Sequence, residues 1–180
     1  MAGKYILGRI SQNRARAARY IVSEAILFLL LAILQTSVLG RVKLFGGIAD
    51  LCFVGLLAVS YFCGRETGAV TGIAVGFLIE ALGSVGISIL PVLYLFCGYV
   101  CGYFTRAIYP KGFISFLVVL ACGLPVRGAI TLIYVCLTYS NIDLLQILLK
   151  TVLPDMAATA LFGLILYYPI KRLCLWMGKA

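Results

Sequence analysis

The sequence predicts an all-α membrane protein, a polytopic bundle of six transmembrane helices with the N- and C-termini in the cytoplasm. Hydrophobic residues make up 63% of the 180 residues and charged residues only 12%, whereas soluble domains contain about 45–50% and about 25%. The apolar residues fall into six runs of about 20 residues, the length that crosses a lipid hydrocarbon core. Of the 15 basic residues, eleven lie on one side of these runs and three on the other. The positive-inside rule assigns the basic side to the cytoplasm.

Residues 1–20 form a basic leader ahead of the first apolar run. We expect it on the cytoplasmic side, either as a plain topology signal or as a helix that lies on anionic headgroups. No small-residue cleavage site follows the run, so the first span is expected to stay uncleaved. The transmembrane domain is predicted over residues 21–173, and a short cytoplasmic tail over residues 174–180.

The first two spans are expected over Ile21–Leu39, which is dense in Leu and Ile, and over Gly46–Cys63. Asp50 then lies near the outer end of the second span. Arg65 and Glu66 mark a tight inner turn. We expect Leu56 in the second span and Leu117 in the fifth to face lipid.

The third span, Thr67–Val85, carries a series in which a glycine recurs every fourth residue. Residues four apart share one helix face, and small residues at that spacing let membrane helices approach closely. Gly98 and Gly102 repeat the spacing in the fourth span, Ile89–Tyr109. We therefore interpret six glycines as helix-packing positions: Gly64, Gly68, Gly72, Gly76, Gly98 and Gly102.

The last two spans are expected over Phe113–Tyr139 and Leu148–Pro169. Pro125 lies in the middle of the fifth span, and because proline cannot donate to the preceding helical turn we expect a kink there. The sixth span ends in Tyr167-Tyr168 and then in Lys171-Arg172. That ending is typical of an interfacial aromatic belt followed by a basic inner stop.

Four charged residues, Asp50, Glu80, Arg127 and Asp155, are expected inside the bundle. Counting 1.5 Å per residue places Glu80, Arg127 and Asp155 at similar depth in the outer half, with Asp50 shallower. An unpaired charge is costly there, so we expect Arg127 to pair with Glu80 or Asp155. The pair would fix helix register, form part of a solute pocket, or serve as a dock for a partner helix.

The residue types argue against an enzyme. The sequence has no histidine, no nucleophile-elbow motif, no zinc-protease motif and no phosphate-cradling loop. The seven cysteines lack Cys-x-x-Cys spacing and are interpreted as small buried apolar residues. We expect no catalytic residues, no metal and no cofactor. The net charge of +9 lies at span ends and does not indicate nucleic-acid binding.

Five stretches share their order and spacing with a known family. They are Leu34-Gln35-Thr36-Ser37, Ala49-Asp50-Leu51, the glycine series from Gly68 to Glu80, Tyr94 with Gly98-Tyr99, and Leu153-Pro154 with Tyr168-Pro169. Over about Leu34 to Leu173 the chain resembles MreD, the rod shape-determining membrane proteins of bacteria. It departs from that family where Ala49 replaces a proline and Glu80 replaces an aspartate.

The resemblance implies a non-enzymatic scaffold in the bacterial cell (inner or plasma) membrane. Such proteins act with MreC in the elongation machinery, which couples MreB filaments to RodA and a class B penicillin-binding transpeptidase during peptidoglycan synthesis and so maintains cell shape. The family is also similar in fold to the substrate-binding S components of energy-coupling-factor vitamin transporters, which is the alternative function. The bulky residues of the first span disfavour that alternative. A lipid-embedded assembly factor of another kind is a third possibility.

Overall fold

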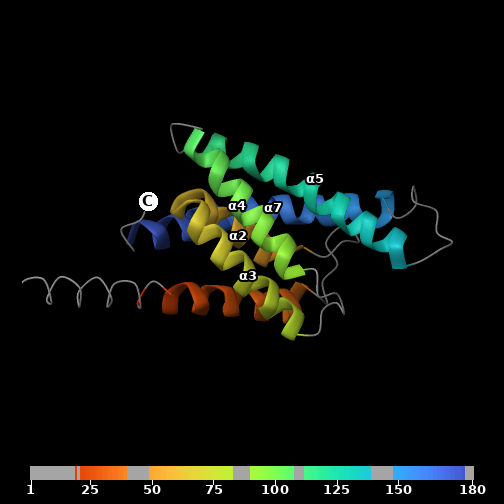
Figure 1. The fold of residues 1–180 in the computed structure, drawn as a ribbon, viewed down its shortest axis with the longest axis horizontal. Helices are drawn as coiled ribbons and strands as arrows, with labels where there is room; N and C mark the ends of the chain where they lie inside the picture. The colour runs from red at the N-terminus through yellow and green to blue at the C-terminus, as the bar shows by residue number, and fades with distance from the viewer. Residues whose placement is uncertain are drawn as a thin grey trace, which may run out of the picture.

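The computed structural model describes residues 19, 21–39, 49–82, 90–107, 112–138 and 148–176, and all regular elements in these ranges are helical (Figure 1). The predicted all-α class is therefore confirmed for the described part of the chain. Almost all of the basic leader, most of the predicted outer loops and the last four residues lie outside these ranges.

Six helices follow one another along the described chain. The first covers residues 21–34 and is extended by the π-helical turn η1. The bounds are η1 Gln35–Leu39, α2 Leu51–Cys63, α3 Arg65–Ala81, α4 Leu90–Ala107, α5 Phe113–Thr138, and the π-helical turn η2 Leu148–Val152, which leads into α7 Leu153–Trp176. Successive helices run in opposite directions, so the first helix begins and α7 ends at the same end of the bundle (Figure 1). In these ranges two stretches, Phe113–Ile133 and Leu148–Leu175, are long and apolar enough to cross a membrane.

The last helix differs from the prediction. It was expected to end at Pro169, but α7 continues to Trp176. The continuation is explained by packing, because Ile170 and Cys174 beyond the proline are completely buried. Tyr167 was expected in an interfacial belt, yet it is only 2% exposed. Its ring packs against Phe113 and Phe116, with centroids 5.1 Å away in both cases.

Helix α2 is the centre of the molecule. All of its residues from Leu51 to Phe62 are buried, and a helix that is apolar on every side belongs in a core. It contacts α3, α4, α5 and α7, while Gly55 faces Phe28 and Leu31 of the first helix. The expectation that Leu56 faces lipid is wrong, because Leu56 is completely buried at this centre. Leu117 on α5 is half-buried.

The glycines of α3 lie against the backbone of α4. A Cβ atom added to Gly68 would lie 2.6 Å from the carbonyl oxygen of Gly98, and one added to Gly72 would lie 2.6 Å from the carbonyl carbon of Tyr94. A Cβ atom on Gly76 would lie 2.8 Å from the nitrogen of Pro91. These distances are below van der Waals contact, so the two helices approach as closely as backbones can.

Gly64 has a different role from the other glycines of the series. It forms the turn between α2 and α3, with φ at 91°, a conformation that residues with a Cβ rarely adopt. The third helix accordingly begins at Arg65 rather than at Thr67. A Cβ atom on Gly102 of α4 would lie 2.7 Å from the carbonyl carbon of Gly64, so α4 packs closely on this turn as well.

Replacing Gly72 by leucine is expected to destabilise the bundle by about 1–3 kcal/mol or more, because overpacking forces the backbones apart. The atoms that a Cβ would meet belong to the backbone of α4, which cannot rotate away. The midpoint of thermal unfolding in detergent, followed by size-exclusion chromatography, measures the effect. Ala74→Leu is the matched control, since Ala74 is an exposed residue of the same helix. Equal midpoints for the two variants would contradict glycine-mediated packing.

Candidate functional site at the start of helix α2

Helix α2 begins inside the bundle, where its first N–H groups have no helical partner. Asp50 is the residue before the helix, and its Oδ1 accepts a hydrogen bond of 3.0 Å from the backbone N–H of Phe53. The backbone N–H of Cys52 donates to Oε1 of Gln35, in η1, at 3.1 Å. Two donors that would otherwise be unpaired in an apolar core are thereby satisfied by side chains.

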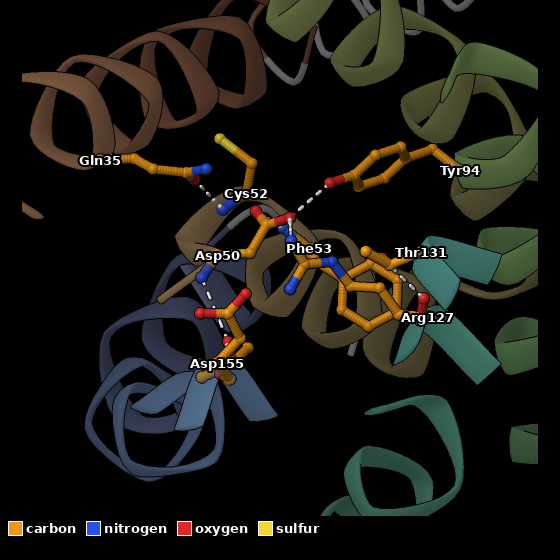
Figure 2. Close-up of polar contacts among 9 residues, drawn as sticks. Gln35, Asp50, Cys52, Phe53, Tyr94, Arg127, Thr131 and Asp155 are labelled. Carbon is orange, nitrogen blue, oxygen red and sulfur yellow. Dashed lines mark hydrogen bonds and ion pairs between the residues drawn. The ribbon is translucent and has the colours of Figure 1, made fainter. Parts of the chain in front are cut away.

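The second oxygen of the Asp50 carboxylate binds two further helices (Figure 2). Its Oδ2 accepts a hydrogen bond of 2.6 Å from the hydroxyl of Tyr94 on α4 and lies 2.7 Å from Nη2 of Arg127 on α5. The side chain of Asp50 is 4% exposed and that of Arg127 is 27% exposed. The guanidinium also stands 5.6 Å from the centre of the Phe53 ring, a cation–π contact.

Helix α7 completes the arrangement through the backbone of Asp50. The Asp50 N–H donates to Oγ1 of Thr159 at 3.2 Å, and the Thr159 hydroxyl donates to the carbonyl of Asp155 at 2.6 Å. Asp155 also attracts Arg127 electrostatically. We call Gln35, Asp50, Tyr94, Arg127 and Thr159 the α2 cap cluster, because these five residues join four elements to the start of α2.

The partner of Arg127 differs from the prediction, which named Glu80 or Asp155. Asp50 forms the ion pair with Arg127, and α2 begins at Leu51 rather than at Gly46, so that Asp50 is the residue before the helix. Asp155 is nearby and contributes attraction. Glu80, in the last turn of α3, is half-buried and is not part of the cluster. Pro125 is exposed, and α5 continues past it to Thr138.

One embedded acid was missed in the sequence. Glu24 lies in the first helix, and its Oε1 accepts a hydrogen bond from the hydroxyl of Thr71, which is 6% exposed. This contact joins the first helix to α3, next to Gly72. The signal was a carboxylate within a run of leucine and isoleucine, where any acid is expected to have a partner.

Six of the seven cysteines have side chains that the structure describes, and Cys136 lies outside that set. Cys52, Cys97, Cys101 and Cys174 are buried and Cys63 is half-buried, but Cys122 on α5 is exposed. In the described ranges, His, Cys, Asp and Glu form no group of three that could hold a metal ion. The α2 cap cluster is thus built from hydrogen bonds and one ion pair, and both oxygens of its carboxylate are occupied.

Comparisons with protein-family models, with curated proteins and with solved structures find no match for the chain. Its function is therefore inferred from its residues and their arrangement.

Removing one member of the Asp50–Arg127 pair is expected to cost more than removing both. Arg127→Met leaves the Asp50 carboxylate charged in an apolar core, and breaking a buried pair in this way costs about 3–5 kcal/mol. Combining Arg127→Met with Asp50→Asn removes the stranded charge and keeps a side chain that caps helices well, so part of the loss should be recovered. Chemical or thermal unfolding in detergent measures both variants.

Glu80→Gln is the control for this pair, because Glu80 is a half-buried acid in the last turn of α3 that lies outside the cluster. Its effect should stay within about 0.5 kcal/mol, as for substitutions away from such networks. The pairing would be contradicted if the double variant were no more stable than Arg127→Met. It would also be contradicted if Glu80→Gln lost as much stability as Arg127→Met.

Tyr94→Phe tests the hydroxyl that reaches Asp50. Removing one donor from a buried carboxylate is expected to cost about 1–3 kcal/mol, while the ring keeps its edge contact with Phe53 at 5.7 Å. Tyr99→Phe, the same change on the same helix, should be nearly neutral because Tyr99 is 43% exposed. Unfolding midpoints compare the stability of the two variants. Equal losses of stability would contradict the hydrogen bond from Tyr94 to Asp50.

Proposed function

We propose that this chain is a multi-pass protein of the bacterial cell membrane, with six spans and both termini in the cytoplasm. The alternating direction of the helices supports this topology (Figure 1), as do the two long apolar stretches of α5 and α7. The distribution of charge supports it too. In the described part of the chain, Arg19, Arg65, Lys171 and Arg172 belong to the end where the first helix begins and α7 ends, whereas Lys150 belongs to the opposite end.

The short central helix fits this topology through its position. The 13 residues of α2 span about 20 Å, which is less than a hydrocarbon core of about 30 Å. With Cys63 at the inner boundary, Asp50 lies about 10 Å below the outer boundary. The α2 cap cluster then belongs to the outer half of the membrane, where an uncompensated helix start or charge is costly.

We further propose that the protein is a non-enzymatic scaffold of the MreD type in the rod-shape elongation machinery. One observation carries the proposal. Gln35, Asp50 and Tyr94 come from three separate stretches that resemble the MreD family, and all three meet in the α2 cap cluster. A resemblance due to apolar composition alone gives no reason for its polar positions to converge on one helix start.

The partners follow from the same resemblance. We propose direct association with an MreC-like membrane protein, and through it with MreB, RodA and a class B penicillin-binding transpeptidase. The chain's part in that machinery is to hold partners in a fixed arrangement rather than to catalyse a step. A rigid bundle suits this part, and the backbone contact of α3 with α4 makes for rigidity.

The alternative, an S component of a vitamin transporter, needs polar groups that are free to bind a solute. Asp50 offers none in this state, because both of its carboxylate oxygens already have partners and the side chain is 4% exposed. This observation favours the scaffold, and the transporter becomes one outcome of the binding experiment below.

Reporter fusions test the topology. A reporter placed after Lys111 should read as cytoplasmic, and one placed after Asn141 should read as external, because the predicted inner side carries most of the basic residues. Paired alkaline phosphatase and green fluorescent protein fusions measure each position with opposite sensitivity. The reversed pattern would overturn the orientation, and the same reading at both positions would overturn the six-span topology.

Affinity purification from native membranes tests the scaffold function. The tagged full-length protein in mild detergent is expected to bring down an MreC-like protein in comparable amount, and its thermal midpoint should not depend on an added small ligand. Gly72→Leu is the fold-disrupted control and should lose the partner, whereas Ala74→Leu should keep it. Stabilisation by a vitamin, without an MreC-like partner, would favour the transporter.

A further inference from the structure

A groove runs between α4 and α5 and reaches down to α2. Its volume is about 270 Å³, and Leu57 of α2 contributes to its lining. The two helices touch each other only weakly, and they diverge from the end at which they are connected (Figure 1). One wall comes from residues 96–104 of α4 and the other from residues 118–126 of α5.

The groove is apolar almost throughout and is open on one side. Cys97 and Cys101 line it as buried residues, whereas Phe96, Phe104 and Val118 are 50% or more exposed. The residues that line it are leucine, phenylalanine, valine, cysteine and glycine, and none of them is charged. In a membrane such a groove opens to lipid rather than to water.

The dimensions of the groove decide what can fill it. Each wall is nine residues of helix, which corresponds to a length of about 12 Å. Spread along that length, the volume gives a mean cross-section of roughly 20 Å², whereas an α-helix with its side chains is about 10–12 Å across and so has a cross-section of about 80–110 Å². A helix therefore cannot enter between α4 and α5, but an unbranched hydrocarbon chain can.

We propose that this groove is a binding site for one fatty-acyl chain of a membrane phospholipid. The chain contacts α4, α5 and the side of α2, so it makes more dispersion contacts than a chain lying on a single convex helix. From the start of α5 at Phe113 the groove extends from about 8 to about 20 Å along the helix, within reach of a chain from the leaflet at that end. This site depends on the membrane location and not on the proposed partners.

Photo-cross-linking tests the site in the full-length protein. The protein is placed in vesicles of phosphatidylethanolamine and phosphatidylglycerol that contain a phospholipid with a diazirine in the middle of one chain. After illumination, mass spectrometry should find adducts several-fold enriched on residues 96–104 and 118–126. The reference positions are Ile114 and Ile165, which are 77% and 67% exposed and lie outside the groove. Adducts in proportion to exposure would overturn the proposal.

Filling the groove provides the second test. Cys122 is exposed and lines the groove, so Cys122→Trp should abolish the enrichment. Ile165→Trp adds the same side chain to α7 and should leave the enrichment unchanged. The unfolding midpoint of Cys122→Trp shows whether the variant is folded. If it is folded and the adducts are still enriched on the groove walls, the site is contradicted.

Competition in the wild-type protein identifies the chain and does not depend on any variant. The protein already lies in unlabelled phospholipid, so the competitor is polyprenyl phosphate, which should leave the ratio of groove adducts to reference adducts unchanged. Displacement by polyprenyl phosphate would overturn the acyl assignment in favour of a branched isoprenoid. Cross-links from the groove to another protein in native membranes would overturn it in favour of a protein occupant.

Discussion

The start of a helix in the middle of an apolar bundle is the constraint on which the rest of the structure depends. Helix α2 is buried on every side, and its first N–H groups cannot reach water. Gln35 and Asp50 accept hydrogen bonds from two of them, and Asp50 introduces a negative charge, which the positive end of the helix dipole stabilises only in part. Arg127 supplies an ion pair and Tyr94 a hydrogen bond, and together they compensate the rest of the Asp50 charge. The buried helix start thus requires Asp50, and the charge of Asp50 in turn requires Arg127 and Tyr94.

The contact between α3 and α4 depends on the close approach of their backbones. Lipid tails are as apolar as the helices themselves, so membrane helices associate through close packing rather than through the hydrophobic effect. Gly68, Gly72 and Gly76 let α3 meet the backbone of α4. Because Tyr94 belongs to α4, this contact also fixes the position from which its hydroxyl reaches Asp50. Packing on one side of the molecule therefore positions a donor on the other.

The sequence predicted contacts that depend on the face of a single helix. It did not predict contacts that depend on how two helices are rotated relative to each other. The four-residue spacing of the glycines points to one face whatever the neighbour is, and the structure places that face on α4. The partner of Arg127 was not predictable from depth, because depth does not determine which way a side chain faces. Asp50 before an apolar run is a helix-start signal, and it places the start of α2 later than the span predicted from Gly46. Glu24 and its partner Thr71 are 47 residues apart, and no local pattern connects them.

The occupied carboxylate also bears on what kind of protein this is. A residue that relays protons or binds a solute must change partners at low cost. Asp50 accepts from a backbone N–H, a hydroxyl and a guanidinium at once, so removing its carboxylate breaks the ion pair and leaves the start of α2 uncapped. Such a group resists change and fixes the register of α2 against α4 and α5. A fixed register favours the proposed scaffold function, because the relative positions of a scaffold's helices determine where it holds its partners.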